Sequence, residues 1–158
     1  MRRHRPTGGS VEGAGVGVDQ ALGSAAYADL LARTRVLLDT IAGSQPPSEV
    51  ATRAADSLAA ATEDLARHTG ELSRRWDGRR LDLPGRGHLL LPPYVIDEVS
   101  DRSLRGRVTF GRVHLGGPAG VHGGAAPLLF DDLLGRLVNR GRPGFVRTAY
   151  LTVRYRKV

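Results

Sequence analysis

The stretch Gly116-Gly-Pro-Ala-Gly-Val-His-Gly-Gly124 and the apolar run behind it, residues 125–138, decide the fold of this chain. The run is nearly all Ala, Leu, Phe and Val, interrupted by the acidic pair Asp131 and Asp132. Glycines at the start of a buried helix leave backbone N–H groups open to a ligand, and the helix dipole favours negative charge there. A carboxylate two turns inside such a helix is costly to bury unless it has a role. We therefore interpret this stretch as an active site.

The segments on both sides of this helix have the two-residue period of strands. Residues 88–91 and 94–96 are short extended candidates, and 103–114 and 145–157 alternate apolar and polar side chains. The helix between them is expected to end near Gly141, because glycine is the residue that most often terminates a helix. A helix that is apolar on nearly every side must be covered. The pattern therefore predicts an α+β fold in which an antiparallel sheet wraps around a central helix.

The N-terminal half has a different organisation. Residues 1–20 are Gly-rich with few bulky apolar groups and are expected to form a disordered tail. Residues 21–76 show two helical stripes separated at Gly43-Ser-Gln-Pro-Pro47, which predicts a helical hairpin reaching about Trp76. Residues 77–87 read as a polar linker, and the main domain is expected to occupy residues 88–158.

Composition narrows the classes of function. The chain has 158 residues, enough for one domain, and a net charge of +7 carried almost wholly by scattered arginines, so we expect an anionic small molecule rather than nucleic acid as the partner. The absence of Cys excludes disulfides, thiolate metal sites and a cysteine nucleophile. No apolar run approaches the roughly 20 residues of a membrane span, and no signal-peptide core follows the basic start. We expect a cytoplasmic protein without a metal site.

The spacing of His122 and Asp131 limits how a single site could be built. Nine residues of helix place them about 13 Å apart at a rise of 1.5 Å per residue. The N–H groups and the carboxylate of one helix are therefore too far apart to reach one carbonyl. Two chains packed around a two-fold axis could bring the amides of one copy to the carboxylate of the other. Such a pair suits acyl transfer, with N–H donors for an oxyanion and a carboxylate as base or nucleophile.

Three features together carry a resemblance to a known family. They are the motif 117–124 (Gly-Pro-Ala-Gly-Val-His-Gly-Gly), Asp131 at its fixed distance behind it, and the strand pattern 148–156 (Thr-Ala-Tyr-Leu-Thr-Val-Arg-Tyr-Arg). With them, residues 88–157 resemble the hotdog-fold acyl-CoA thioesterases, in the phenylacetate-degradation and thioesterase-superfamily branch. The resemblance implies a homodimer or higher oligomer with sites at the subunit interface, and hydrolysis of an acyl-CoA thioester. No cofactor is implied, because coenzyme A is part of the substrate.

The resemblance also implies roles for particular residues. Asp131 would be the base or nucleophile, and the Gly123 N–H would hold the thioester oxygen beside His122 of the same turn. Thr148 would help to orient water, which completes the catalytic set. The substrate-binding residues implied are Gly124, Arg154 and Arg156.

Some of these residues have a simpler interpretation. His122 could shape the turn rather than transfer protons, and Arg154 and Arg156 could form an exposed strand face. Asp132 is expected to be a solvated neighbour, or to substitute for Asp131 if the helix register shifts. Gly116 stands where some relatives carry an Asn that assists the oxyanion site.

The resemblance includes one departure at the end of the pattern. Relatives continue beyond the position of Val158 with two further strands, so the hotdog domain is expected to be C-terminally incomplete. The alternative function is therefore a catalytically inactive hotdog subunit that acts as a dimerisation or interaction module.

Overall fold

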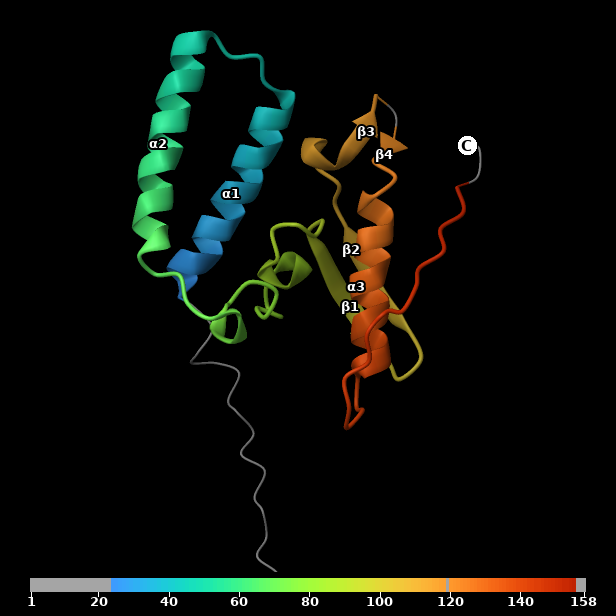
Figure 1. Cartoon of the computed structure of the whole chain (residues 1–158). Helices are drawn as coiled ribbons and strands as arrows, with labels where there is room; N and C mark the ends of the chain where they lie inside the picture. Colours follow the sequence, from blue (N-terminus) through green and yellow to red (C-terminus); the bar gives the residue numbers. More distant parts are fainter. Residues whose placement is uncertain (1–23, 119, 156–158) are drawn as a thin grey trace, which may run out of the picture.

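The computed structural model describes residues 24–118 and 120–155, so the expected tail and Arg156 lie outside the described residues. Within these ranges the chain is α+β, with three α-helices and two small antiparallel sheets. Two helices form a hairpin at one side of the molecule, and the third lies against the larger sheet at the other (Figure 1). The α+β class and the N-terminal helix pair are confirmed.

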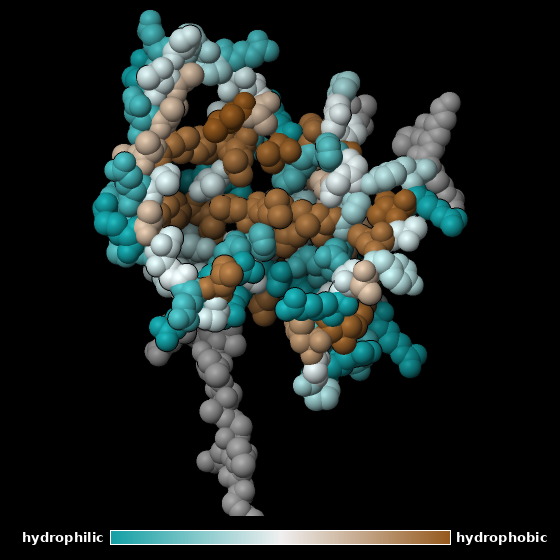
Figure 2. Space-filling model, viewed as in Figure 1, coloured by the Kyte–Doolittle hydropathy of each residue, from teal (hydrophilic) through white to brown (hydrophobic). Residues whose placement is uncertain are grey.

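The hairpin consists of α1 (Ala25–Gly43) and α2 (Ser48–Ala66), joined by a short loop. Ser24 caps α1, and its hydroxyl accepts a hydrogen bond from the Tyr27 N–H at 3.4 Å. Leu31 is the buried residue of α1, whereas α2 has none. Figure 2 shows apolar side chains gathered between the hairpin and the sheet, with polar residues on the outer side of α2.

The second helix is shorter than expected. It ends at Ala66 rather than near Trp76, because the Thr69 hydroxyl donates to the Ala66 carbonyl at 2.8 Å and Gly70 follows, a residue with low helix propensity. Trp76 instead packs edge-on against Tyr27 of α1, with ring centroids 5.0 Å apart. The aromatic pair holds the returning chain against the first helix.

Residues 67–93, which we call the connector, pack between the hairpin and the rest of the molecule. They contain two 3-10 turns, η1 (Leu72–Arg74) and η2 (Pro84–Gly87). Arg35 of α1 donates hydrogen bonds of 3.3, 2.8 and 3.0 Å to three connector carbonyls, those of Pro84, His88 and Leu91. The connector, which includes the expected linker 77–87, is thus hydrogen-bonded to α1 through the Arg35 side chain.

The larger sheet pairs β1 (Tyr94–Val99) with β2 (Leu104–Val108) in antiparallel register, from Tyr94 opposite Val108 to Val99 opposite Leu104. The third helix, α3 (Ala125–Asn139), lies over this sheet (Figure 1). Leu91, Tyr94 and Leu129 form the buried core between them, and the partly buried residues packed around it are Ile96, Val108, Phe110, Leu128 and Leu133.

A second, very short sheet precedes α3. It pairs β3 (Leu115–Gly117) with β4 (Gly120–Val121), directly after the 3-10 turn η3 (Arg112–His114). This turn contacts α1, where the Asp39 carboxylate accepts the Val113 N–H at 3.1 Å. The hairpin is therefore attached to the rest of the molecule both at the connector and at η3.

Two expected strands are not formed in the described residues. Residues 88–91 are turns, and residues 145–155 run without strand pairing and are exposed. The Asn139 side chain exchanges two hydrogen bonds with the Val146 backbone, at 2.9 and 2.6 Å, and so holds the chain beside the end of α3 rather than at a sheet edge. The sheet consequently lies against one face of α3 instead of surrounding it, and Phe130 on that helix is 56% exposed.

Candidate functional site

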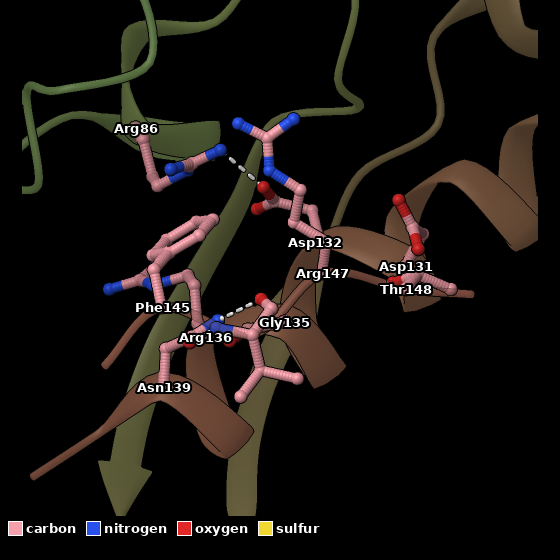
Figure 3. A pocket seen from close by; sticks show the side chains of 10 residues that line it. Arg86, Asp131, Asp132, Gly135, Arg136, Asn139, Phe145, Arg147 and Thr148 are labelled. Atoms are coloured by element: carbon pink, nitrogen blue, oxygen red, sulfur yellow. Dashed lines mark hydrogen bonds and ion pairs between the residues drawn. The ribbon is translucent and has the colours of Figure 1, made fainter. Parts of the chain in front are cut away.

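An open cavity of about 520 Å³ lies beside the middle and C-terminal half of α3. Figure 3 shows side chains from α3, from the connector and from the chain after α3 converging on it. Its walls contain two carboxylates and three guanidinium groups, so it is a charged cavity. The charged and hydroxyl side chains that line it include those of Arg86, Asp131, Asp132, Arg136, Arg147 and Thr148.

Asp131 and Thr148, both expected to be catalytic, line this cavity together. They lie at the same end of it, one on α3 and the other on the following segment (Figure 3). Asp131 is half-buried and makes no hydrogen bond or ion pair with other residues that the structure describes. Its carboxylate is therefore available to accept a proton from water, with the Thr148 hydroxyl nearby as a hydrogen-bonding partner.

Asp132, which the sequence suggests to be a solvated neighbour, is the more buried acid. Its side chain is 12% exposed and forms an ion pair with Arg86 of the connector. The Tyr94 hydroxyl donates to Asp132 Oδ2 at 2.6 Å, and Arg136 Nη1 donates to the Tyr94 oxygen at 3.0 Å. Burial, and then the hydrogen bond to Asp132, raise the pKa of Tyr94. Asp132 thus serves to join β1, the connector and α3.

Arg86 reaches Asp132 from an uncommon backbone conformation. Its φ of 59° is in the left-handed region, between Gly85 and Gly87, which also have positive φ. A non-glycine residue there costs about 1–2 kcal/mol. Its Nε is buried without a hydrogen-bond partner among the described residues. Such strained residues cluster at functional sites, so Arg86 is a further candidate functional residue. The sequence reasoning did not single it out, although its position between two glycines indicates an unusual backbone conformation.

The turn before α3 has its own hydrogen bonds. His122 Nδ1 accepts the Gly124 N–H at 3.0 Å, and the His122 carbonyl accepts the Ala125 N–H at 2.9 Å. His122 therefore shapes the turn, and the Gly124 N–H is occupied. The Gly123 carbonyl accepts a hydrogen bond from the Tyr155 hydroxyl, while the Gly123 N–H has no partner within residues 24–118 and 120–155.

The structure separates the expected site residues into two groups. Asp131 and Thr148 share the cavity, whereas His122, Gly123 and Gly124 lie at the N-terminal end of α3 and do not line it. Arg154 is exposed on the C-terminal segment and is also outside the cavity. The guanidinium groups present at the cavity are instead those of Arg86, Arg136 and Arg147.

Within the described ranges, no group of three or more His, Asp or Glu side chains is arranged to hold a metal ion. None of the helices in this part of the chain is both long and apolar enough to cross a bilayer. Comparison with protein-family models, curated proteins and solved structures finds no match to this chain. Function must therefore be argued from the site.

Proposed function

We propose that this chain is a hotdog-type acyl-CoA thioesterase that acts in the cytoplasm as a homodimer. The observation that carries the proposal is the shared cavity of Asp131 and Thr148. A free carboxylate beside a hydroxyl can position and deprotonate a water molecule for attack on a carbonyl. The arginine side chains of the same cavity provide positive charge for an anionic substrate.

In the proposed reaction, Asp131 accepts a proton from water as the water oxygen attacks the thioester carbon. The C–S bond then breaks, and the proton passes to the leaving thiolate, so the products are a free acid and coenzyme A. The developing oxyanion needs an N–H donor. The Gly123 N–H, which has no partner among the described residues, would supply it from a second copy of the chain. Within one copy, Gly123 precedes α3 and Asp131 lies about two turns into this helix, so the two are too far apart.

The two neighbouring acids differ in their suitability as a base. The Asp132 carboxylate is held by Arg86 and by the Tyr94 hydroxyl, which leaves it committed to structure. Asp131 has no such partner in the described part of the chain. We therefore assign the chemistry to Asp131.

Release of coenzyme A from a panel of short, medium and long acyl-CoAs tests the proposal. The chain should hydrolyse at least one of them, and Asp131→Asn should lower kcat by at least about 100-fold, since general-base catalysis contributes 10²–10⁴. Asp101→Asn, in the exposed turn after β1, is the matched control and should retain full activity. Undiminished hydrolysis by Asp131→Asn would exclude this residue as the base.

A second function, an inactive dimerisation or interaction module, is favoured by one observation. Phe130 and Leu134, one turn apart on α3, are exposed, and Phe145 and Tyr150 of the following segment are also exposed. An apolar surface of this kind is typical of an interface. Sedimentation analysis of Phe130→Asp against the unchanged chain tests it. Loss of a dimer in the variant, with no hydrolysis across the whole panel, would support the module and reject the enzyme.

A further inference from the structure

A second cavity, of about 380 Å³, is formed by the connector. Arg86 lines both this cavity and the one that contains Asp131, so the two adjoin at its side chain. The new cavity is rich in donors and poor in apolar surface. Its charged and polar lining residues are Ser73, Arg75, Asp77, Arg79, Arg86 and His88.

The guanidinium groups of two of its arginines make no contact with the charged or polar groups of residues 24–118 and 120–155. Arg75 and Arg79 are exposed and make no hydrogen bond or ion pair through their side chains with any residue that the structure describes. Among the lining residues the carboxylate is that of Asp77, whose Oδ2 lies 3.6 Å from His88 Nε2, a contact that becomes an ion pair when His88 is protonated. The cavity therefore presents two uncommitted guanidinium groups.

The shared wall adds a further donor. Arg86 uses one terminal nitrogen for Asp132, and its Nε is buried without a partner in the described residues. Leaving a buried donor unpaired is costly, and the strained backbone of Arg86 holds it in place. Arg86 is thereby held at a fixed position in the wall of this cavity.

A glycine brings the walls close together. Gly78 is buried with φ of +73°, and a Cβ at this position would lie 3.3 Å from the His88 ring and 3.9 Å from Arg86 Nη2. The positive φ disfavours any other residue. The tight turn at Gly78 thus places Arg79 beside Arg86 and His88 at one cavity.

We propose that this cavity binds the phosphate groups of a small nucleotide-like molecule through Arg75 and Arg79, with Arg86 at the inner wall. Guanidinium groups match phosphate oxygens in bidentate geometry, and a diphosphate or phosphate ester is the anion that uses several of them at once. Because Arg86 lies in the walls of both this cavity and the Asp131 cavity, we assign the phosphates to coenzyme A, and this last identification rests on the proposed function.

Calorimetric titration with adenosine 3′,5′-bisphosphate and with pyrophosphate tests the site directly. The double variant Arg75→Gln/Arg79→Gln should weaken binding of the bisphosphate at least about tenfold, and added salt should weaken binding to the unchanged chain. The matched control is Arg53→Gln/Arg102→Gln, two exposed arginines that lie outside both cavities, and it should bind normally.

Three results would overturn the proposal. They are no binding of either probe, equal loss in the control variant, and tighter binding of a single-stranded oligonucleotide that depends on Arg75 and Arg79. The last result would assign the surface to nucleic acid. Circular dichroism of each variant establishes that it remains folded, so a loss of binding cannot be due to unfolding.

Kinetics separate this site from the proposed function. Arg75→Gln/Arg79→Gln should raise KM for acyl-CoA and leave kcat unchanged, while Asp131→Asn should bind the bisphosphate as the unchanged chain does. Bisphosphate binding through these arginines without hydrolysis of any acyl-CoA would reject the enzyme and retain the site. Hydrolysis with an unchanged KM in the double variant would reject the site and retain the enzyme.

Discussion

The Tyr94 hydroxyl and the Asp132 carboxylate, 38 residues apart in sequence, form a hydrogen bond of 2.6 Å that joins the start of β1 to the middle of α3. Tyr94 is only 4% exposed, and its ring belongs to the core with Leu91 and Leu129. The same hydroxyl accepts from Arg136, and Asp132 also pairs with Arg86. One partly buried network therefore fixes the connector, the sheet and the helix around the Asp131 cavity.

Removal of the Tyr94 hydroxyl should weaken the fold. Tyr94→Phe keeps the ring in the core but leaves Asp132 without one donor and Arg136 without its acceptor. We expect the free energy of unfolding to fall by about 1–3 kcal/mol, measured by urea denaturation. Tyr150→Phe, at a side chain that is 86% exposed, is the control and should not differ from the unchanged chain. Equal stability of Tyr94→Phe would show that the network contributes nothing.

Gly87 should not tolerate a side chain. Its φ is +69°, and a Cβ would lie 3.1 Å from Leu31 Cδ1 and 3.2 Å from Arg80 Cβ. Gly87→Ala should therefore lower the midpoint of urea unfolding, with a cost of about 1–2 kcal/mol from the backbone alone. Gly70→Ala is the control, because nothing lies within 4 Å of its Cβ position. A stabilised Gly87→Ala protein would contradict the left-handed conformation.

Arg35 should be needed for attachment of the hairpin to the connector. Arg35→Met removes the donors of three carbonyls, those of Pro84, His88 and Leu91, and should destabilise the protein by more than about 2 kcal/mol. Hydrogen exchange should also become faster in α1. Arg33→Met, which loses only an exposed pair with Asp29, should change the stability by less than about 0.5 kcal/mol. Similar effects of the two substitutions would argue against the contact.

Stability should decrease on acidification through His114. Burial lowers the pKa of His114 from 6.5, and the attraction of Asp39 only partly opposes this. Below pH 6.5 the unfolded chain therefore binds more protons than the folded chain, so the contribution of His114 is present above this pH and is lost as the pH falls through the folded pKa. The NMR titration of the imidazole, assigned with His114→Gln, checks this. A titration midpoint of His114 above pH 6.5 would mean that its contribution to stability increases, rather than decreases, on acidification.

Sequence patterns predicted the existence of the helices, although α2 ends at Ala66 rather than near Trp76. Apolar residues recur at three- and four-residue spacing in α1. Gly141, with φ of +67°, follows the end of α3, as expected for a glycine that terminates a helix. Periodicity reports which face of a segment is apolar, and for a helix all backbone bonds are local. The existence of a helix can thus be read from its own residues.

Strands lack that independence. Residues 145–157 alternate as cleanly as β2, yet the described part of this segment pairs with no strand. Alternation defines two faces but does not provide the neighbouring backbone that a strand needs. Here the hydrogen bonds between Asn139 and Val146 direct the chain along α3.

The candidate site was predictable in part. The spacing behind the glycine motif singled out Asp131, and the structure places it with Thr148 at one cavity. The different surroundings of Asp131 and Asp132 were not predictable, because neighbouring helical residues point about 100° apart and the partners of each side chain depend on tertiary packing. Arg86, 46 residues before Asp132, is such a partner.

The second helix of the hairpin contains 19 residues, and none of them is buried. Isolated helices of this length are marginal in water, and most helical stability in proteins comes from packing. Opening α2 therefore exposes little new apolar surface and need not disturb the core at Tyr94. We therefore expect α2 to open at a lower free energy than the rest of the chain, so that it can melt and re-form while the cavity around Asp131 persists.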